Sequence, residues 1–154
     1  MSAWDDIMTV GPAHDRGRAF DLPHPLTGAP SGIRLTIAGP DGRIARTAQH
    51  ALLDGLAEAT GPDGRVSAEA RERLRLDALA RVVLGWEGDG LPAFSALAVR
   101  QALEASPYLA RATDAMAGSR DHYAPDTGRP APSGVDALQA MAAILAQGKP
   151  GMGE

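Results

Sequence analysis

Residues 82–95 read VVLGWEGDGLPAFS, and the interpretation of this stretch decides both the fold and the candidate chemistry. Two carboxylates, Glu87 and Asp89, lie among three glycines directly after an apolar run. A calcium-binding EF-hand loop needs oxygen ligands at alternate positions and a closing Glu. Leu91 and Ala98 stand at two of the places where those ligands should be. The stretch is therefore not interpreted as a calcium loop.

We interpret it instead as a corner between two helices. The helix before the corner would end at Gly85, and Ser95 would cap the helix that follows. Two aromatic side chains, Trp86 and Phe94, can pack together across the turn and set the angle between the helices. The carboxylates would stay at the exposed tip. The residues expected to form this structural corner are Trp86, Gly88, Gly90, Phe94 and Ser95.

Apolar periodicity predicts further helices on both sides of the corner. Serines at positions suited to N-caps, Ser67, Ser95 and Ser106, mark the starts of three of them. In the helix after the corner, Leu97 and Leu103 are expected to face the core. The predicted helices cover residues 41–59, 67–85, 95–104 and 106–118.

Residues 18–37 have an apolar period of two instead. Phe20 and Leu22 alternate with polar neighbours, and Leu35 and Ile37 do so more clearly. We expect a two-stranded hairpin with a long connection, whose apolar face needs covering by helices. Its open edge could accept a strand from another chain. The predicted fold class is mainly α with a small N-terminal β-hairpin (α+β): a compact helical domain with a flexible N-terminal tail and a C-terminal helix after a Pro- and Gly-rich linker.

The N-terminal residues 1–17 are expected to form a tail with a short apolar patch. Ser2 can cap a helical turn in which Trp4, Ile7 and Met8 share one face. This segment is either a disordered terminus or a docking peptide, since an exposed Trp beside apolar neighbours is a common interface anchor.

A second apolar segment follows the domain predicted at residues 18–124. After a Pro- and Gly-rich linker at 125–134, residues 135–147 predict a helix that is apolar nearly all round. Such a helix should be buried, either on its own domain or on another protein. Residues 148–154 form a short tail. The apolar side chains of this helix are Val135, Leu138, Met141, Ile144 and Leu145.

Composition narrows the classes of function. The 154 residues suit one domain, and the formal net charge of −4 argues against a nucleic-acid clamp. Arginines between 71 and 81 are mixed with Glu69 and Asp77 at helical spacing, which favours a solvated helix face. No apolar run approaches a membrane span, and there is no cysteine. The first residues, MSAWDDIM, have acids where a signal peptide needs bases and an apolar stretch, so we expect no signal peptide. A soluble cytoplasmic protein is expected.

Catalytic and metal motifs are weak. A phosphate-binding loop needs Lys followed by Ser or Thr, whereas Lys149 precedes Pro150. The four histidines are far apart, three of them in predicted loops, without metal-ligand spacing. The polar pairs at 5–6 and 121–122 are expected to be solvated. We therefore expect no enzyme, no cofactor and no metal. The histidines are His14, His24, His50 and His122.

Three stretches together resemble the tail assembly chaperones of long-tailed bacteriophages. They are GWEG with LPAFS in the corner, SPYLARATDAMAGSRDHYA at residues 106–124, and FDLPHPLTGAPSGIRLTIAGPDG at residues 20–42. That family has a W-[ED]-G corner, a P-F-S helix start, and entry strands that lead into an I-x-G-P-D turn. The chain departs from the pattern in a shorter loop after the corner Trp and in Tyr123, where Phe is common.

The resemblance implies a non-enzymatic phage protein made in the host cytoplasm. Such chaperones coat the tape measure protein and recruit major tail (tube) subunits before the tube polymerises. Partner contacts would then fall on the two apolar terminal segments. The resemblance leaves undecided whether the protein forms a homo-oligomer. The alternatives are a structural virion protein (a capsid decoration or head–tail joining component), a regulatory module that binds a host protein, and an enzyme. The Gly148-Lys149 pair contains the only Lys of the chain. Many chaperones of this family are extended by ribosomal frameshifting at a slippery sequence that encodes Gly-Lys, so this pair also suggests a frameshift site.

Overall fold

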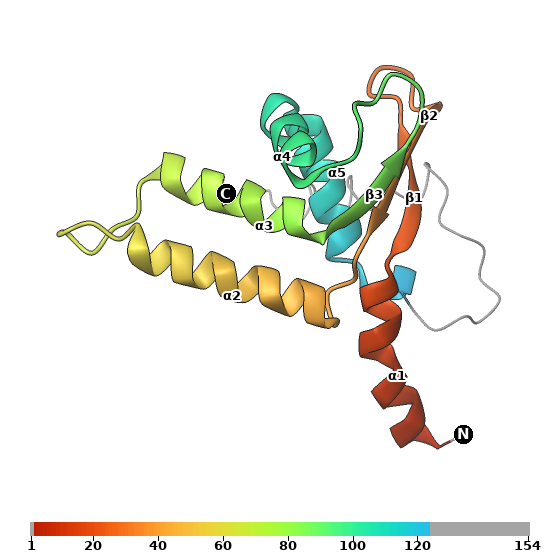
Figure 1. Cartoon of the computed structure of the whole chain (residues 1–154), viewed down its shortest axis with the longest axis horizontal. Coiled ribbons are helices and arrows are strands. Elements are labelled where there is room, and N and C mark those ends of the chain that lie inside the picture. Colours follow the sequence, from red (N-terminus) through yellow and green to blue (C-terminus); the bar gives the residue numbers. More distant parts are fainter. Residues whose placement is uncertain (1, 124–154) are drawn as a thin grey trace, which may run out of the picture.

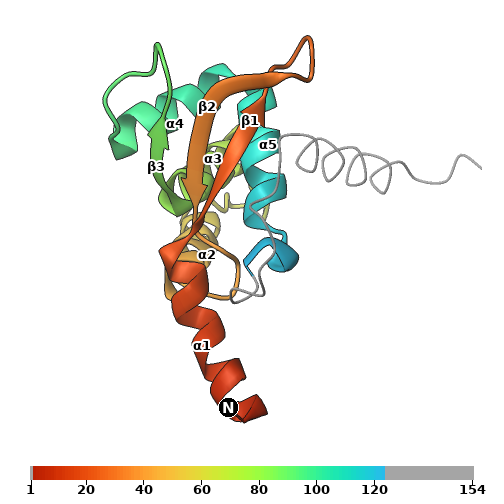
Figure 2. The same cartoon turned by 90° about the vertical axis from the view of Figure 1, so that its right-hand side faces the viewer.

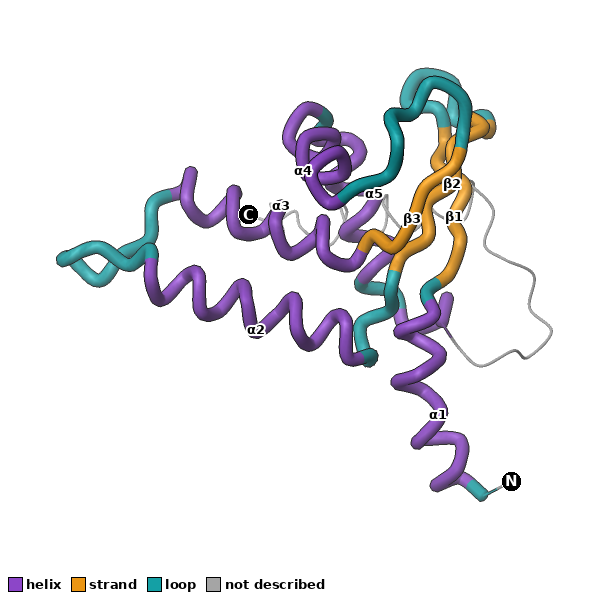
Figure 3. The backbone as a smooth tube through the Cα atoms, viewed as in Figure 1, coloured by secondary structure: helices purple, strands orange, loops and turns teal. Residues whose placement is uncertain are grey.

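Helices make up most of the described part of the chain, which is residues 2–123 of a computed structural model (Figures 1 and 3). The mainly α architecture with a small antiparallel sheet is confirmed. The predicted linker at 125–134 and helix at 135–147 lie outside the described residues. The elements are α1 (Ala3–Arg16), β1 (Arg18–Pro23), β2 (Pro30–Ile37), α2 (Arg43–Glu58), α3 (Ala68–Val82), β3 (Val83–Glu87), α4 (Ala96–Ala105), α5 (Pro107–Ala117) and the 3₁₀ turn η1 (Arg120–Tyr123).

The sheet contains one strand more than the hairpin predicts. Strands β1 and β2 form the expected antiparallel pair, in which Phe20 lies opposite Leu35. Strand β3 then pairs antiparallel with the other edge of β2, with Trp86 also opposite Leu35, which gives the order β1-β2-β3. The prediction of a helix–helix corner is therefore wrong: α3 ends at Val82, and the chain continues as a strand, not as a helix to Gly85.

The physical reason lies in a short apolar run that suits both structures. Val83, Leu84 and Trp86 continue the apolar spacing of α3, but β-branched and aromatic residues also favour strands. The exposed edge of β2 offers unpaired backbone groups, and a strand there satisfies them. This tertiary pairing outweighs the local helical pattern.

The two faces of the sheet differ in polarity. Phe20, Leu35 and Ile37 are buried on the inner face, where they pack with residues of α2, α3 and α5 (Figure 2). On the outer face Arg34 lies between Asp21, at 3.0 Å, and Glu87, at 3.9 Å. Because one face of the sheet is polar and the other apolar, apolar residues recur at every second position along the strands. The helices cover the apolar face, as expected for the hairpin.

The core consists of two adjoining clusters that share Trp86 and Leu109 at their margins. The first joins the sheet to α2 and α5, and the second joins α3 to α4 and α5. Tyr108 also fastens α5 to the hairpin, because its hydroxyl donates to the Pro23 carbonyl at 2.6 Å. The buried residues of the first cluster are Phe20, Leu22, Leu35, Ile37, Ala38, Ala48, Val82, Ala112, Met116 and Tyr123; those of the second are Leu76, Leu79, Val83, Val99, Leu103 and Ala110.

The predicted helix caps are confirmed. Each of the three serines accepts a hydrogen bond from the backbone N–H three residues later, at 3.0–3.1 Å. Leu103 is buried as expected, but Leu97 is 66% exposed, so its predicted inward orientation is wrong. At 100° per residue Leu97 is about 200° around α4 from the buried Val99, so it faces away from the side of the helix that Val99 and Leu103 bury. The capping serines are Ser67, Ser95 and Ser106.

The N-terminal segment forms a longer helix than the single turn suggested by its apolar spacing. Ser2 and Asp5 form a reciprocal capping box, and α1 then runs for 14 residues through Pro12 to Arg16. Gly17 follows with a φ of 75°, a left-handed conformation that favours glycine and turns the chain into β1. No helix among residues 2–123 is long and apolar enough to cross a membrane.

Candidate functional site

Helix α1 projects away from the rest of the molecule, and only its C-terminal end meets other elements (Figures 1 and 2). Three large apolar side chains near its N-terminal end are exposed: Trp4 at 67%, Ile7 at 61% and Met8 at 58%. Their spacing places them on one side of the helix. We call these three residues the α1 apolar face. They are the predicted N-terminal binding residues that fall within the described chain.

A buried histidine anchors the other end of α1. His14 is only 2% exposed, and its Nδ1 accepts a hydrogen bond from the Asp41 backbone N–H at 2.9 Å. Its carbonyl accepts from the Gly39 N–H at 2.9 Å, and its ring lies 5.1 Å from that of Tyr123. The prediction that His14 lies in a loop is wrong. This imidazole holds α1 against the turn before α2.

Asp15 continues this anchor by capping a different helix. The first residue before α2 is Gly42, which has no side chain to cap the helix. Asp15 Oδ1 accepts the Ile44 N–H at 2.9 Å and takes over that role from α1. A Cβ at position 42 would collide with this carboxylate, so the glycine makes the close approach possible. Helices α1 and α2 are thus joined end to end.

An ion pair completes the same junction. The Arg120 guanidinium donates two hydrogen bonds to the Asp41 carboxylate, at 2.7 and 2.9 Å, and ties η1 to the turn before α2. These bonds lower the pKa of the Asp41 carboxyl. Burial lowers the pKa of the His14 imidazole, against the opposing effect of the Asp41 charge. We call His14, Asp15, Asp41, Arg120 and Tyr123 the α1 junction.

The α1 apolar face and the α1 junction lie along one stripe of the same helix. At 100° per residue, positions 4, 7, 8, 11, 14 and 15 share one side of α1. The lower half of the stripe contacts the body through His14 and Asp15, and the upper half carries Trp4, Ile7 and Met8 in the open. An apolar helix side usually packs against another element. The upper half is therefore a candidate binding surface.

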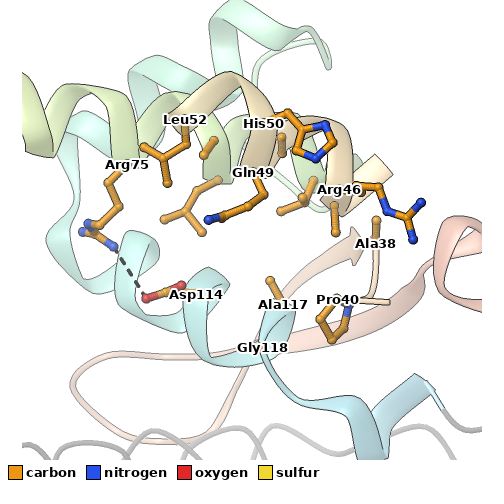
Figure 4. Close-up of a pocket in the computed structure, with 15 residues that line it drawn as sticks. Ala38, Pro40, Arg46, Gln49, His50, Leu52, Arg75, Asp114, Ala117 and Gly118 are labelled. Carbon is orange, nitrogen blue, oxygen red and sulfur yellow. Dashed lines mark ion pairs between the residues drawn. The ribbon is translucent and has the colours of Figure 1, made fainter. Parts of the chain in front are cut away.

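A second candidate is a groove of about 440 Å³ between α2, α3 and α5 (Figure 4). Small side chains, including Ala45, Ala48 and Ala78, line its floor. Its rim is polar: Arg75 and Asp114 form an ion pair at 3.7 Å at one end, and Arg46 and His50 lie at the other. An apolar helix laid here would desolvate these charges, which is costly. The groove is therefore the weaker candidate.

The glycine-rich stretch after β3 is a structural element. Trp86 Nε1 donates to the Pro92 carbonyl at 3.0 Å, and its ring meets Phe94 edge to face with centroids 5.8 Å apart. The expected Trp86–Phe94 packing is confirmed, in a loop between a strand and a helix. Gly88 and Gly90 have φ values of 146° and 81°, which suit the turns expected of them. Glu87 pairs with Arg34.

The remaining polar candidates are separated in the fold. His24 Nδ1 accepts a backbone hydrogen bond from Leu26 in the hairpin loop, His50 lines the groove, and His122 lies 5.5 Å from the Phe20 ring. Asp5 belongs to the capping box of α1. Within residues 2–123 no three His, Asp or Glu side chains are grouped to hold a metal ion. The predicted contacts of Val135, Leu138, Met141, Ile144 and Leu145 lie outside the described residues.

Sequence reasoning missed the α1 junction, although part of its signal is visible. A helix start at Gly42 without a capping side chain indicates that an acceptor must come from elsewhere. Nothing in the sequence shows that Asp15 supplies it from 29 positions away. Comparisons with known proteins add no assignment: no family model, curated protein or solved structure matches the chain.

Proposed function

We propose that this protein is a tail assembly chaperone of a long-tailed bacteriophage, acting in the host cytoplasm by binding and without catalysis. In this role it holds the tape measure protein and recruits tail tube subunits before the tube polymerises. The support from sequence is the resemblance at GWEG, LPAFS and residues 106–124. These stretches form the end of β3, parts of the loop after it, the helix α5 and the turn η1.

The observation that carries the proposal is the α1 apolar face on its fixed base. An exposed Trp beside two apolar neighbours has the composition of a binding hot spot. The α1 junction holds the helix in one direction, so α1 itself loses little conformational entropy when a partner binds. A long helical partner such as a tape measure protein suits a projecting helix face.

Repetition along the partner would compensate for the small size of the face. Three side chains bury too little area for a stable one-to-one complex. Several copies bound along one rod reinforce one another, because each neighbour raises the effective concentration of the next. Binding without catalysis is also consistent with the polar groups at the base of α1, which are engaged in structural hydrogen bonds.

The test is co-purification with tape measure and tube proteins, which the proposal expects to be encoded beside this chain. The full-length protein is expected to recover the tape measure protein. Trp4→Ala should weaken that complex by roughly 30-fold, about 2 kcal/mol at a hot-spot residue. Leu26→Ala is the matched control, because Leu26 is 87% exposed at the tip of the hairpin, in a different element from α1. Recovery of neither tail protein, or equal loss in both variants, would contradict the proposal.

Mass spectrometry of purified virions separates the main alternative. A chaperone should be absent or scarce in the particle, whereas a decoration or head–tail joining protein should be present in stoichiometric copies. Stoichiometric recovery would therefore favour the structural virion protein over the chaperone.

A further inference from the structure

We propose that residues 135–147 of the same molecule cover the α1 apolar face, and that a partner must displace them to bind there. The face is an exposed helix side that continues directly from a packed one. The segment 135–147 carries apolar side chains nearly all round, so it needs a surface to cover it. The position of the chain, its length and its charges favour this pairing.

The described chain ends beside the C-terminal end of α1, which we call its foot; the N-terminal end is its tip. Tyr123 packs against His14, with their rings 5.1 Å apart, so the following residues start beside the α1 junction. The eleven residues 124–134 can span at most about 36–40 Å. Met8 and Trp4 lie only about 9–15 Å from His14 along the helix axis. The segment can therefore reach the α1 apolar face without strain.

Length and direction also match. Thirteen helical residues at 135–147 would be about 20 Å long, and the 14 residues of α1 are about 21 Å long. A segment that starts at the foot of α1 and runs toward its tip is antiparallel to it. Neighbouring helices joined by a short connection commonly pack in this way.

Charge complementarity favours the same direction. In an antiparallel pair Asp136 lies near the foot of α1, where Arg16 is, and Lys149 lies near the tip, where Asp5 and Asp6 are. Lys149 is the only lysine in the chain. A parallel arrangement would place Asp136 beside the two aspartates and would be repulsive.

The alternative occupants fit less well. A second copy would meet only three apolar side chains, far less than a stable dimer interface buries. An attached segment needs less area, because the connection raises its effective concentration. The groove between α2, α3 and α5 would place the apolar segment against the charged side chains of Arg75 and Asp114. The charges beside the α1 apolar face are Asp5 and Asp6 at the tip and Arg16 at the foot, and the charges of the segment match them in an antiparallel pair.

Disulfide trapping in the full chain tests this packing, because the protein has no native cysteine. We expect Met8→Cys with Ile144→Cys to form an intramolecular disulfide, at a rate independent of protein concentration. The matched control is Thr9→Cys with Ile144→Cys, which moves one partner by a single residue, about 100° around α1 and away from the α1 apolar face. The control should react on the order of tenfold more slowly. Equal rates in the two pairs, or disulfide-linked dimers, would overturn the proposal.

Hydrogen exchange gives a second, cysteine-free measurement. Leu138→Asp with Ile144→Asp should release the segment and speed exchange of the α1 amides at residues 6–10 on the order of tenfold. Gln139→Asp with Gln147→Asp adds the same charge and should leave that exchange unchanged. Unchanged α1 exchange in the first variant would also overturn the proposal. No tail protein is present, so the outcome is independent of the proposed partners.

Discussion

The two tryptophans of this chain, Trp4 and Trp86, have opposite environments. Trp86 lies opposite Leu35 in the sheet, joins both core clusters, and satisfies its indole N–H on Pro92. Trp4 is 67% exposed on a projecting helix. Each is followed directly by an acidic residue and has apolar residues within four positions, so local composition does not distinguish them. The difference is set by the elements that fold back on each residue, and it separates a structural aromatic from a candidate binding one.

The largest expected effect is on unfolding. Trp86→Ala should lower the free energy of unfolding by about 3 kcal/mol, because it opens a cavity between the two clusters and removes the bond to Pro92. Trp4→Ala should lower it by less than about 1 kcal/mol, because its side chain lies outside both clusters. Urea unfolding followed by circular dichroism measures both. Similar losses in the two variants would remove the distinction.

His14→Ala tests whether the α1 junction directs Trp4. The change leaves the Asp41 N–H without its acceptor and opens space beside Tyr123, so we expect a loss of about 2 kcal/mol. Exchange of the α1 amides should rise while that of β3 stays protected. His14→Asn is the control, since its side-chain oxygen can replace Nδ1 as the acceptor. Loss of protection in β3 to the same extent would mean that the junction supports the whole fold.

Acid should act on the same junction with a defined sign. Because burial lowers the pKa of His14 in the folded chain, the unfolded chain binds the proton first as the pH falls. The stabilisation that comes from keeping the imidazole neutral is complete above pH 6.5, the ordinary pKa of a histidine. It declines as the pH falls below that value. Asp41 and Asp15 partly oppose the shift, and Arg120 adds to it. Unfolding at pH 7.5 and 5.5 measures the decline, which His14→Asn should reduce.

Removal of the cap shared between helices should have a smaller effect. Asp15→Ala leaves the Ile44 N–H without its carboxylate, and we expect a loss of about 1.5 kcal/mol, typical of an N-cap. Asp15→Asn retains an acceptor and should recover most of it. Thermal unfolding of the three proteins gives the comparison. If Asn is no better than Ala, the carboxylate acts through its charge and not through this hydrogen bond.

The smallest effect concerns the aromatic partner of Trp86. Phe94 is 44% exposed and meets the Trp86 ring edge to face, so Phe94→Ala should cost about 0.5–1 kcal/mol. A double-mutant cycle with Trp86→Ala should show most of this cost to be coupling between the two rings. Additive losses would show that the rings act separately and that Pro92 alone positions Trp86.

The sequence predicts well those features that depend on neighbouring residues. The hairpin, the α2 helix and the serine caps follow from alternation, helical spacing and N-cap chemistry, and all are found. The Trp86–Phe94 contact also follows, because a short loop keeps the two rings together.

Features that depend on distant residues are missed. Residues 83–87 are a strand because the β2 edge is available, and that edge exists only after folding. The Asp15 cap and the burial of His14 each join positions more than 20 residues apart. The α1 apolar face is visible in the sequence as a pattern, but its projection from the body depends on this junction.

One carboxylate shared between two helices also has a mechanical consequence. Because the first turn of α2 is held by Asp15, a force that tilts or pulls α1 is transmitted directly to α2. Helix α2 packs along α3, which leads straight into β3, so this contact gives a second route from α1 to the sheet beside the direct chain connection through Gly17 to β1. A chain gripped at the tip of α1 would thus be mechanically connected to the interior of the protein.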